Sequence, residues 1–382
     1  MSTARASGVT GSGWSLSQVD QRTRVQVLVI AALLALTLFA LPARMSAYWT
    51  DVATAVAIFS VVSLGLGLLM GRVGLVSLGQ ISVLALGAWV AARLAFATSL
   101  PFPVVLLASG LITMVLGTLV GLPALRLSGL YLALITLMLA GAIGVVLAST
   151  DFPNGAGGFL GHSESSFGNP GVRRPSIATS DSAYFRYTVV FSALMFLIAL
   201  AHARAKPGRA WAAIRQSEPA ALAAGVNITL YKLWAFALAS FMTGVAGGLL
   251  AGSVGHLFTT QFPTSQNIVL LAVVLMGGIY SLWGAVVAGM LIKLLPALLD
   301  NWGLPADLLT ILFGVGVLQV LTTAPAGLAA QVPRDLGRLG SSLARLVPGR
   351  AAQPERRAAS SEEAAALPPH ERRPPVSEGK AE

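Results

Sequence analysis

Residues 52–70 read VATAVAIFSVVSLGLGLLM and contain no charged side chain. An α-helix of about 20 residues is long enough to cross the roughly 30 Å hydrocarbon layer of a bilayer. A helix also pairs its backbone N–H and C=O groups within one segment, as a lipid environment requires. The stretch therefore predicts a membrane-spanning helix.

Similar apolar stretches recur along the chain, separated by short breaks that contain Gly, Pro or Arg. We expect ten spans, at residues 25–41, 52–70, 81–98, 101–122, 130–148, 184–202, 232–254, 266–280, 284–299 and 306–323. The predicted fold class is all-α, a polytopic membrane helical bundle. Within it, the glycine- and serine-rich residues 71–82 (GRVGLVSLGQIS) predict a broken or re-entrant stretch that is buried in protein.

The composition also indicates a membrane protein. Of the 382 residues, 55% are hydrophobic and 10% are charged, and the mean hydropathy is +0.77. Soluble domains contain about 25% charged residues. The net charge of +10 comes from basic residues beside apolar segments, so it indicates membrane topology rather than nucleic-acid binding. The chain has no cysteine, which excludes disulfides and thiolate metal sites.

Basic residues near span ends favour the cytoplasmic side of a membrane. The loop around residues 203–230 has one acid, Glu218, against five basic residues, Arg204, Lys206, Arg209, Arg215 and Lys232. We therefore expect this loop to be cytoplasmic. Counting spans from it places both termini in the cytoplasm and the loop 150–183 outside.

The predicted organisation has three parts. Residues 1–24 form a cytoplasmic N-terminal segment, 25–328 the transmembrane domain, and 329–382 a cytoplasmic, largely disordered tail rich in Arg, Glu, Pro, Ala and Ser. Leu41-Pro-Ala after the first span is similar to a signal-peptide cleavage site. The 24 polar residues before that span favour a retained helix instead.

Several kinds of chemistry find no support in the sequence. Ion-coupled transporters need carboxylates within the membrane, and the predicted spans contain only Asp307, near an end. No lysine stands in a GxxxxGK[ST] loop, so the chain has no such ATP site. There is no metal-ligand spacing among the histidines and no GxSxG or HExxH motif. We expect no catalytic residues, no metal and no cofactor.

The most informative stretch is 208–227, GRAWAAIRQSEPAALAAGVN, between two strongly apolar spans. Ser217 is a predicted N-cap, Pro219 fits the first helical turn, and Gly225 fits a left-handed stop, which together predict a helix of about two turns. Its alanines would allow another surface to approach closely, with Arg209 and Arg215 anchored to acidic groups. A lipid-facing interfacial helix is the alternative interpretation.

This stretch resembles the coupling motif of ABC importer permeases, and in detail the LivM-type branched-chain amino-acid permeases. Residues at matching positions imply an ATPase-coupling site, namely Arg209, Ala210, Ile214, Arg215, Glu218, Ala221 and Gly225. Three further blocks are similar to the same family: residues 77–80 with 87–88, residues 125–133 and residues 277–285. The resemblance covers about residues 52–328.

The resemblance implies a permease subunit of the inner membrane that imports branched-chain or related amino acids. It implies a homologous second permease subunit, two cytoplasmic ATPases that bind the ATP, and an external solute-binding protein as partners. Urea or short amides are an alternative substrate class, and a non-transporting scaffold or receptor is an alternative of another kind.

Polar residues at membrane depth are candidates for a translocation path. They are Ser77, Gln80, Ser82, Tyr131 and Thr136, and each either lines the path or bonds a neighbouring carbonyl. Glycines four residues apart occur at Gly244, Gly248 and Gly252, and at Gly117 and Gly121. We expect these two rows to serve close helix packing inside the subunit rather than subunit pairing.

Overall fold

The computed structural model describes residues 37–38, 41–122, 127, 129–149, 172, 174–304, 306–323 and 327–329. Over these residues the regular structure is helical, and no strand occurs among them. The all-α class predicted from the apolar stretches is confirmed.

Seven helical segments in the described part are long and apolar enough to cross a membrane. They are α3 (Ala47–Gly67) with its π-helical continuation η2 (Leu68–Val73), α4 (Gln80–Ala97), α5 (Phe102–Gly121), α6 (Gly129–Ser149), α7 (Asp181–Arg204), α10 (Ile228–Val254), and α12 (Leu282–Gly289) continued by the π-helix η5 (Met290–Leu294) and α13 (Leu295–Asn301). The remaining helices are α2 (Leu41–Arg44), α8 (Lys206–Gln216), α9 (Glu218–Ala223), η4 (Thr259–Gln261), α11 (Gln266–Gly277) and α14 (Ala306–Thr323). The polytopic helical bundle is confirmed.

Each predicted span from residue 52 onward coincides with a helix, but the count of ten stays a prediction. The first predicted span, 25–41, lies almost wholly outside the described residues, as do the two predicted tails. Helix α11 has 12 residues, fewer than the roughly 20 that a full crossing needs.

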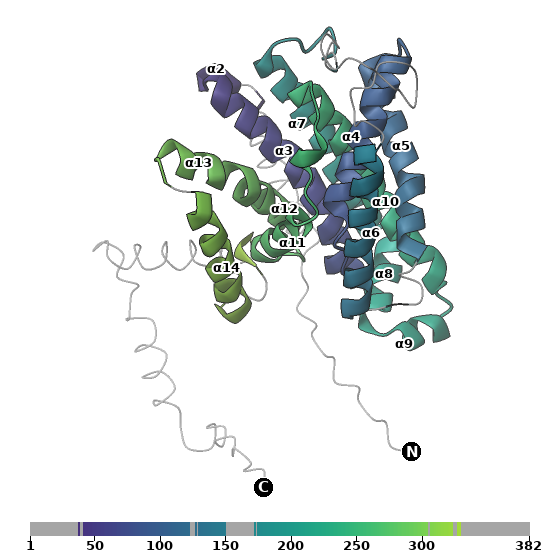
Figure 1. Cartoon of the computed structure of the whole chain (residues 1–382). Helices are drawn as coiled ribbons and strands as arrows, with labels where there is room; N and C mark the ends of the chain where they lie inside the picture. Colours follow the sequence, from purple (N-terminus) through teal and green to yellow (C-terminus); the bar gives the residue numbers. More distant parts are fainter. Residues whose placement is uncertain are drawn as a thin grey trace, which may run out of the picture. The chain divides into compact units, whose positions relative to one another are not determined.

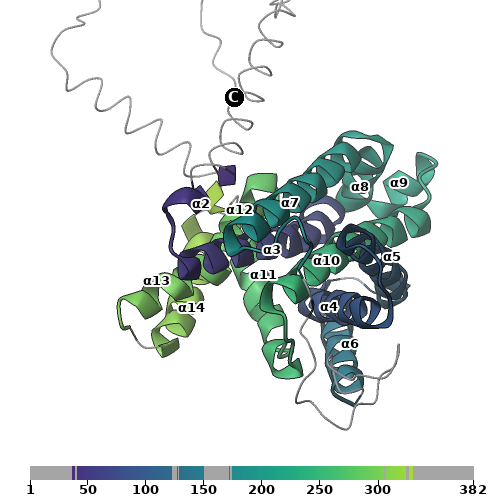
Figure 2. The same ribbon diagram turned by 90° about the horizontal axis from the view of Figure 1, so that it is seen from above.

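Helix α10 lies at the centre of the bundle. It contacts α5, α4 and α3, and α3 in turn contacts α7 and α12 (Figures 1 and 2). α10 is buried on most of its circumference because its sequence alternates small and apolar side chains without charge from Leu233 to Val254. A helix of that composition is expected to be surrounded by other helices.

Glycines let α10 approach its neighbours closely. A Cβ on Gly244 would lie 2.6 Å from Cβ of Thr113 on α5, and one on Gly87 of α4 would lie 2.6 Å from Cα of Gly244. The hydroxyl of Ser109 donates to the carbonyls of Gly87 (2.8 Å) and Gly244 (3.0 Å), so it joins three helices. Backbones at this distance maximise dispersion contacts, which replace the hydrophobic driving force in lipid.

Both predicted glycine rows face inward. A Cβ on Gly248 would lie 2.6 Å from Leu106, and one on Gly252 would collide with the Tyr184 hydroxyl. In the second row, a Cβ on Gly117 would collide with Ser240, and one on Gly121 would lie 2.6 Å from Phe236. The two rows therefore serve packing inside the subunit, as the sequence predicted.

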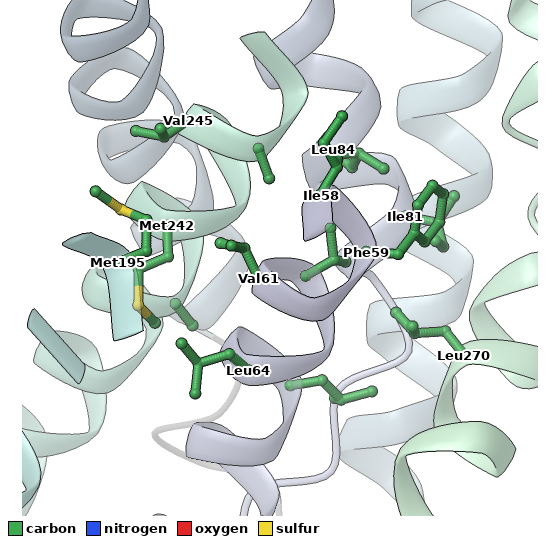
Figure 3. Packing of buried hydrophobic residues seen from close by; sticks show 14 of the residues in the cluster. Ile58, Phe59, Val61, Leu64, Ile81, Leu84, Met195, Met242, Val245 and Leu270 are labelled. Carbon is green, nitrogen blue, oxygen red and sulfur yellow. The ribbon is translucent and has the colours of Figure 1, made fainter. Parts of the chain in front are cut away.

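The apolar core surrounds the middle of α3. Figure 3 shows side chains of α3, among them Ile58, Phe59, Val61 and Leu64, packed among residues of neighbouring helices. The neighbours that it labels are Ile81, Leu84, Met195, Met242, Val245 and Leu270. The core thus joins α3, α4, α7, α10 and α11.

The chain is non-helical from Gly74 to Gly79, within the predicted broken stretch. Side chains of other helices accept hydrogen bonds from backbone N–H groups in this stretch and just after it. The Leu78 N–H donates to Oγ1 of Thr136 on α6, and the Ile81 N–H at the start of α4 donates to Oδ1 of Asn267 on α11, each over 2.9 Å. This pairing is what allows irregular backbone beside apolar helices.

Candidate functional site

Helix α8 was not predicted as a separate helix. Pro207 lies in its first turn, where a missing N–H costs nothing. Ala210, Trp211 and Ile214 are buried on one face, with the spacing of a helix that packs on one side. The Trp211 Nε1–H donates to the Tyr231 carbonyl over 2.8 Å, which attaches α8 to α10. The spacing of these three apolar residues was the signal in the sequence.

The turn from α8 into α9 has the predicted N-cap. Ser217 is extended (φ −163°, ψ 115°), and its Oγ accepts a hydrogen bond from the Ala220 N–H over 3.4 Å. Pro219 lies in the first turn of α9. Ser217 thus ends one helix and begins the next, because its side chain replaces a backbone acceptor that the first turn lacks.

Gly225 ends α9 in the left-handed conformation that the sequence predicted, with φ of 80°. The Val226 N–H donates to the Ala221 carbonyl over 3.0 Å, and the Gly225 N–H donates to the Leu222 carbonyl over 2.9 Å. This is the hydrogen-bond pattern of the Schellman motif. Asn227 follows directly and caps α10, since its Oδ1 accepts from the Leu230 N–H over 3.0 Å. The predicted helix of about two turns is thus α9, of six residues.

An ion pair connects α9 to α10. Nζ of Lys232 lies 2.8 Å from Oε1 of Glu218, and the lysine side chain is only 4% exposed, against 46% for the glutamate. A buried ammonium is costly without a paired charge. Glu218 therefore fixes the first turn of α9 against α10, in addition to the Trp211 contact of α8.

Arg215 contacts other segments of its own chain, and its anchoring to acidic groups of a partner stays a prediction. Its Nη1 donates to the carbonyl of Gly71 in η2 over 2.8 Å. The centre of its guanidinium lies 4.5 Å from the ring centroid of Tyr280. The reason is geometric: η2 and Tyr280, which lie far from Arg215 in the sequence, are folded against α8. Arg209 of the same helix is exposed as well.

The seven predicted coupling residues divide into two groups. Ala210, Ile214 and Ala221 are buried against the bundle, because helical periodicity turns them inward. The outer face of α9 instead presents Leu222, 63% exposed, with Ala220 and Ala223 beside it. Figure 1 shows α8 and α9 together at one end of the bundle. We call residues 206–227 the coupling loop from here on.

Four of the five candidates for a translocation path are buried inside the subunit. Gln80 accepts from the Thr243 hydroxyl over 3.0 Å, and Ser82 donates to the Ala140 carbonyl over 3.2 Å. Thr136, besides accepting from Leu78, donates to the Ala133 carbonyl over 3.0 Å. Ser77 is buried as well. Gln80, Ser82 and Thr136 have the bonds to neighbouring groups that the sequence allowed as the alternative, and path lining stays a prediction for all four residues.

Tyr131 is different, because it is 73% exposed on α6. A tyrosine ring at that exposure contacts lipid or another chain rather than the core of its own subunit. Tyr131 is therefore the one candidate among the five whose side chain lies on the surface of the described part of the subunit.

Two cations lie within helices and were not singled out from the sequence. Arg93 of α4 is fully buried beside the Trp89 ring, 5.8 Å from its centroid. Lys293 lies in the π-helical segment η5, with Nζ 4.2 Å from the Phe59 ring centroid. Among the described residues, no group of three His, Cys, Asp or Glu is placed to hold a metal ion. The described part of the chain thus offers cation–π contacts but no chelating cluster.

Comparisons with known proteins identify relatives. Residues 48–321 match the family model described as the branched-chain amino acid transport system / permease component. The high-affinity branched-chain amino acid transport system permease protein LivM of Salmonella typhimurium is 31% identical over 305 residues, which are 74% of this chain and 71% of the relative. LivM of Escherichia coli is 29% identical over 302 residues, with the same two coverages. No solved structure has significant similarity to the chain.

Proposed function

Because the chain belongs to the branched-chain amino acid transport system permease family, we propose that it is a transmembrane subunit of an ATP-driven importer for branched-chain or related amino acids. Family membership makes it a multi-pass membrane transport subunit. The energy source, the substrate, the partners and the orientation in the membrane are what we propose in addition.

The coupling loop is the observation that supports ATP-driven transport best. Its two short helices present Leu222 outward, while Trp211 and Glu218 attach the same segment to α10. An exposed apolar side chain on an otherwise polar segment is available to contact a partner protein. A force applied at Leu222 therefore reaches the central helix of the bundle through a hydrogen bond and an ion pair.

The partner at this surface is an ATPase in the proposal. The chain itself has no phosphate-binding lysine: Lys206 is followed by Pro207, and Lys232 is buried and paired with Glu218. Two separate ATPase subunits bind the ATP, and this subunit needs no cofactor. A homologous second permease subunit completes the membrane part, and an external solute-binding protein delivers the substrate.

The orientation follows from charge. The coupling loop and its flanks carry the basic excess described above, which supports a cytoplasmic location in the inner membrane, with both termini on the same side. In transport, ATP-driven closure of the ATPases moves the coupling loop. The displacement opens the path alternately to the two sides of the membrane.

Uptake by the reconstituted complex tests this function. The chain, its second permease subunit, the two ATPases and the solute-binding protein are placed in liposomes that contain ATP, and radiolabelled leucine and urea are offered separately. We expect ATP-dependent uptake of leucine and no ATP hydrolysis by the chain alone. Uptake of urea but not leucine would reassign the substrate, and a complex that transports neither would contradict the proposed function.

A further inference from the structure

Three segments far apart in the sequence meet beside the coupling loop. They are the end of η2 at Gly71, the turn between α11 and α12 at Tyr280, and the C-terminal turn of α8 at Arg215. We call this meeting point the Arg215 junction. It brings together the coupling loop and two helices of the membrane domain, α3 through η2 and α12 through the turn that precedes it.

The two membrane segments of the junction contact each other through their backbones. A Cβ on Gly71 would collide with the Ile279 carbonyl, so no side chain separates η2 from the turn at 278–281. A displacement of Tyr280 is therefore passed to η2, because close-packed groups transmit strain. The junction moves as a unit rather than as two independent contacts.

Arg215 connects the coupling loop to both segments at once. One N–H of its guanidinium donates to the Gly71 carbonyl, while the central carbon of the same group lies over the Tyr280 ring. A planar guanidinium can donate along its edge and stack with its face, which a lysine ammonium does not reproduce. The position therefore suits arginine for a physical reason that the exposed Arg209 of the same helix does not share.

Glycines with positive φ flank the junction on both membrane segments. Gly74, just after η2, has φ of 85°, and Gly278, just before Tyr280, has φ of 111°. Both angles are available mainly to glycine. In addition, η2 is a π-helical segment, a distortion of the kind found at functional sites in helices. Each membrane segment thus has, next to the junction, a backbone position that favours glycine.

A cavity adjoins the junction. Its lining includes Tyr280, Arg72 of η2, Ala199 of α7 and Leu282 of α12. Ser63 of α3 also lines it, and the Ser63 hydroxyl is buried without a hydrogen-bond partner among the described residues. The Tyr280 side chain of the junction therefore borders a cavity rather than a closely packed neighbour on that side.

We propose that Arg215 is a positioning residue that transmits the displacement of the coupling loop to α3 and α12, rather than a residue that docks the ATPase. The inference rests on the proposed function, because it requires an ATPase at the coupling loop. It separates the loop into an outer face that contacts the ATPase, around Leu222, and an inner side that drives the membrane helices, at Arg215.

The test uses the full complex in liposomes and measures three quantities: co-purification of the ATPases, ATP hydrolysis and leucine uptake. For Arg215→Ala we expect unchanged co-purification, continued ATP hydrolysis and a fall in uptake of at least about fivefold, the lower end of typical coupling between sites. The ATP consumed per leucine rises. Arg204→Ala is the matched control, an exposed arginine just before α8 whose uptake should stay at the wild-type level.

A second pair of variants keeps the inference testable if Arg215→Ala does not fold. Tyr280→Phe retains the aromatic face and should retain uptake, whereas Tyr280→Leu removes it and should behave as Arg215→Ala does. Loss of ATPase co-purification in Arg215→Ala would make Arg215 a docking residue and overturn the inference while leaving the proposed function intact. Equal uptake by the phenylalanine and leucine variants would also overturn it. A wild-type complex without ATP-driven uptake would overturn the proposed function itself.

Discussion

The helices around α10 are packed through backbone contacts, whereas the coupling loop is attached through side chains. Along α10, glycines bring helix backbones into contact with α4 and α5, and Ser109 bonds to carbonyls of two helices at once. At the coupling loop, single side chains make the connections. Arg215 and Glu218, which make two of them, are both exposed.

This difference distinguishes a rigid group of helices, α4, α5 and α10, from the coupling loop, which is attached less firmly. A backbone contact without an intervening side chain has no alternative rotamer, so α4, α5 and α10 move together. A hydrogen bond or cation–π contact from a long exposed side chain contributes about 1 kcal/mol and can form and break. The molecule therefore has one group of helices that keeps its shape and one loop whose attachments can change.

The largest expected effect comes from disrupting the rigid group of helices. Gly247→Val places a branched side chain against the backbone of α4, at the Leu84 carbonyl and the Ala88 N–H. Overpacking typically costs about 1–3 kcal/mol and more where backbone must move, so we expect little folded protein in detergent. Gly144→Val on α6 is the control, because a Cβ there meets nothing within 4 Å. Equal yields and melting temperatures for the two variants would contradict the close packing of α10 against α4.

The next effect concerns the ion pair of the coupling loop. Glu218→Ala leaves the buried Lys232 without its carboxylate, at a cost of about 1–3 kcal/mol. We expect a lower melting temperature and weaker ATPase co-purification, with insertion intact. The double variant Glu218→Ala, Lys232→Met should recover most of the stability, because no charge is then left buried. A double variant that melts below the single one would show that Lys232 has another essential contact.

A smaller effect is expected at the end of α9. Gly225→Val forces a β-branched residue into a left-handed conformation at a cost of about 1–2 kcal/mol. A Cβ there meets nothing within 4 Å, so the cost is conformational and not steric crowding. We expect normal insertion but reduced leucine uptake by the complex. Gly225→Asn should be milder, because asparagine adopts this conformation more readily, and equal activity of both variants would contradict this account.

Features that depend on neighbouring residues were predicted from the sequence, whereas contacts between distant segments were not. Ser217 and Gly225 were predicted correctly because a cap and a left-handed stop depend on residues within a few positions. The helices from residue 52 onward were predicted because a long apolar stretch is itself the signal. The span count was not settled, since residues 25–41 lie largely outside the described part and α11 is short.

Contacts between distant segments were not predictable in the same way. The contacts of Arg215 within the chain were not predicted, because the sequence gives no sign that Gly71 and Tyr280 lie beside α8. Likewise, the hydrogen bonds of Gln80, Ser82 and Thr136 join α4 and the stretch before it to α6 and α10, which are far from them in the sequence. Their lining of a path stays a prediction, and Tyr131 is the path candidate with an exposed side chain.

The central claim is that the outer face of α9 lies in the cytoplasm and contacts the ATPase. The chain has no cysteine, so a single Leu222→Cys substitution reports on that face alone, and Ser165→Cys provides a position predicted to lie outside. An impermeant maleimide should label position 222 only in inside-out vesicles stripped of the ATPases, and adding the ATPases back should block the reaction. Labelling of position 222 in intact cells, or labelling unchanged by the ATPases, would contradict the account.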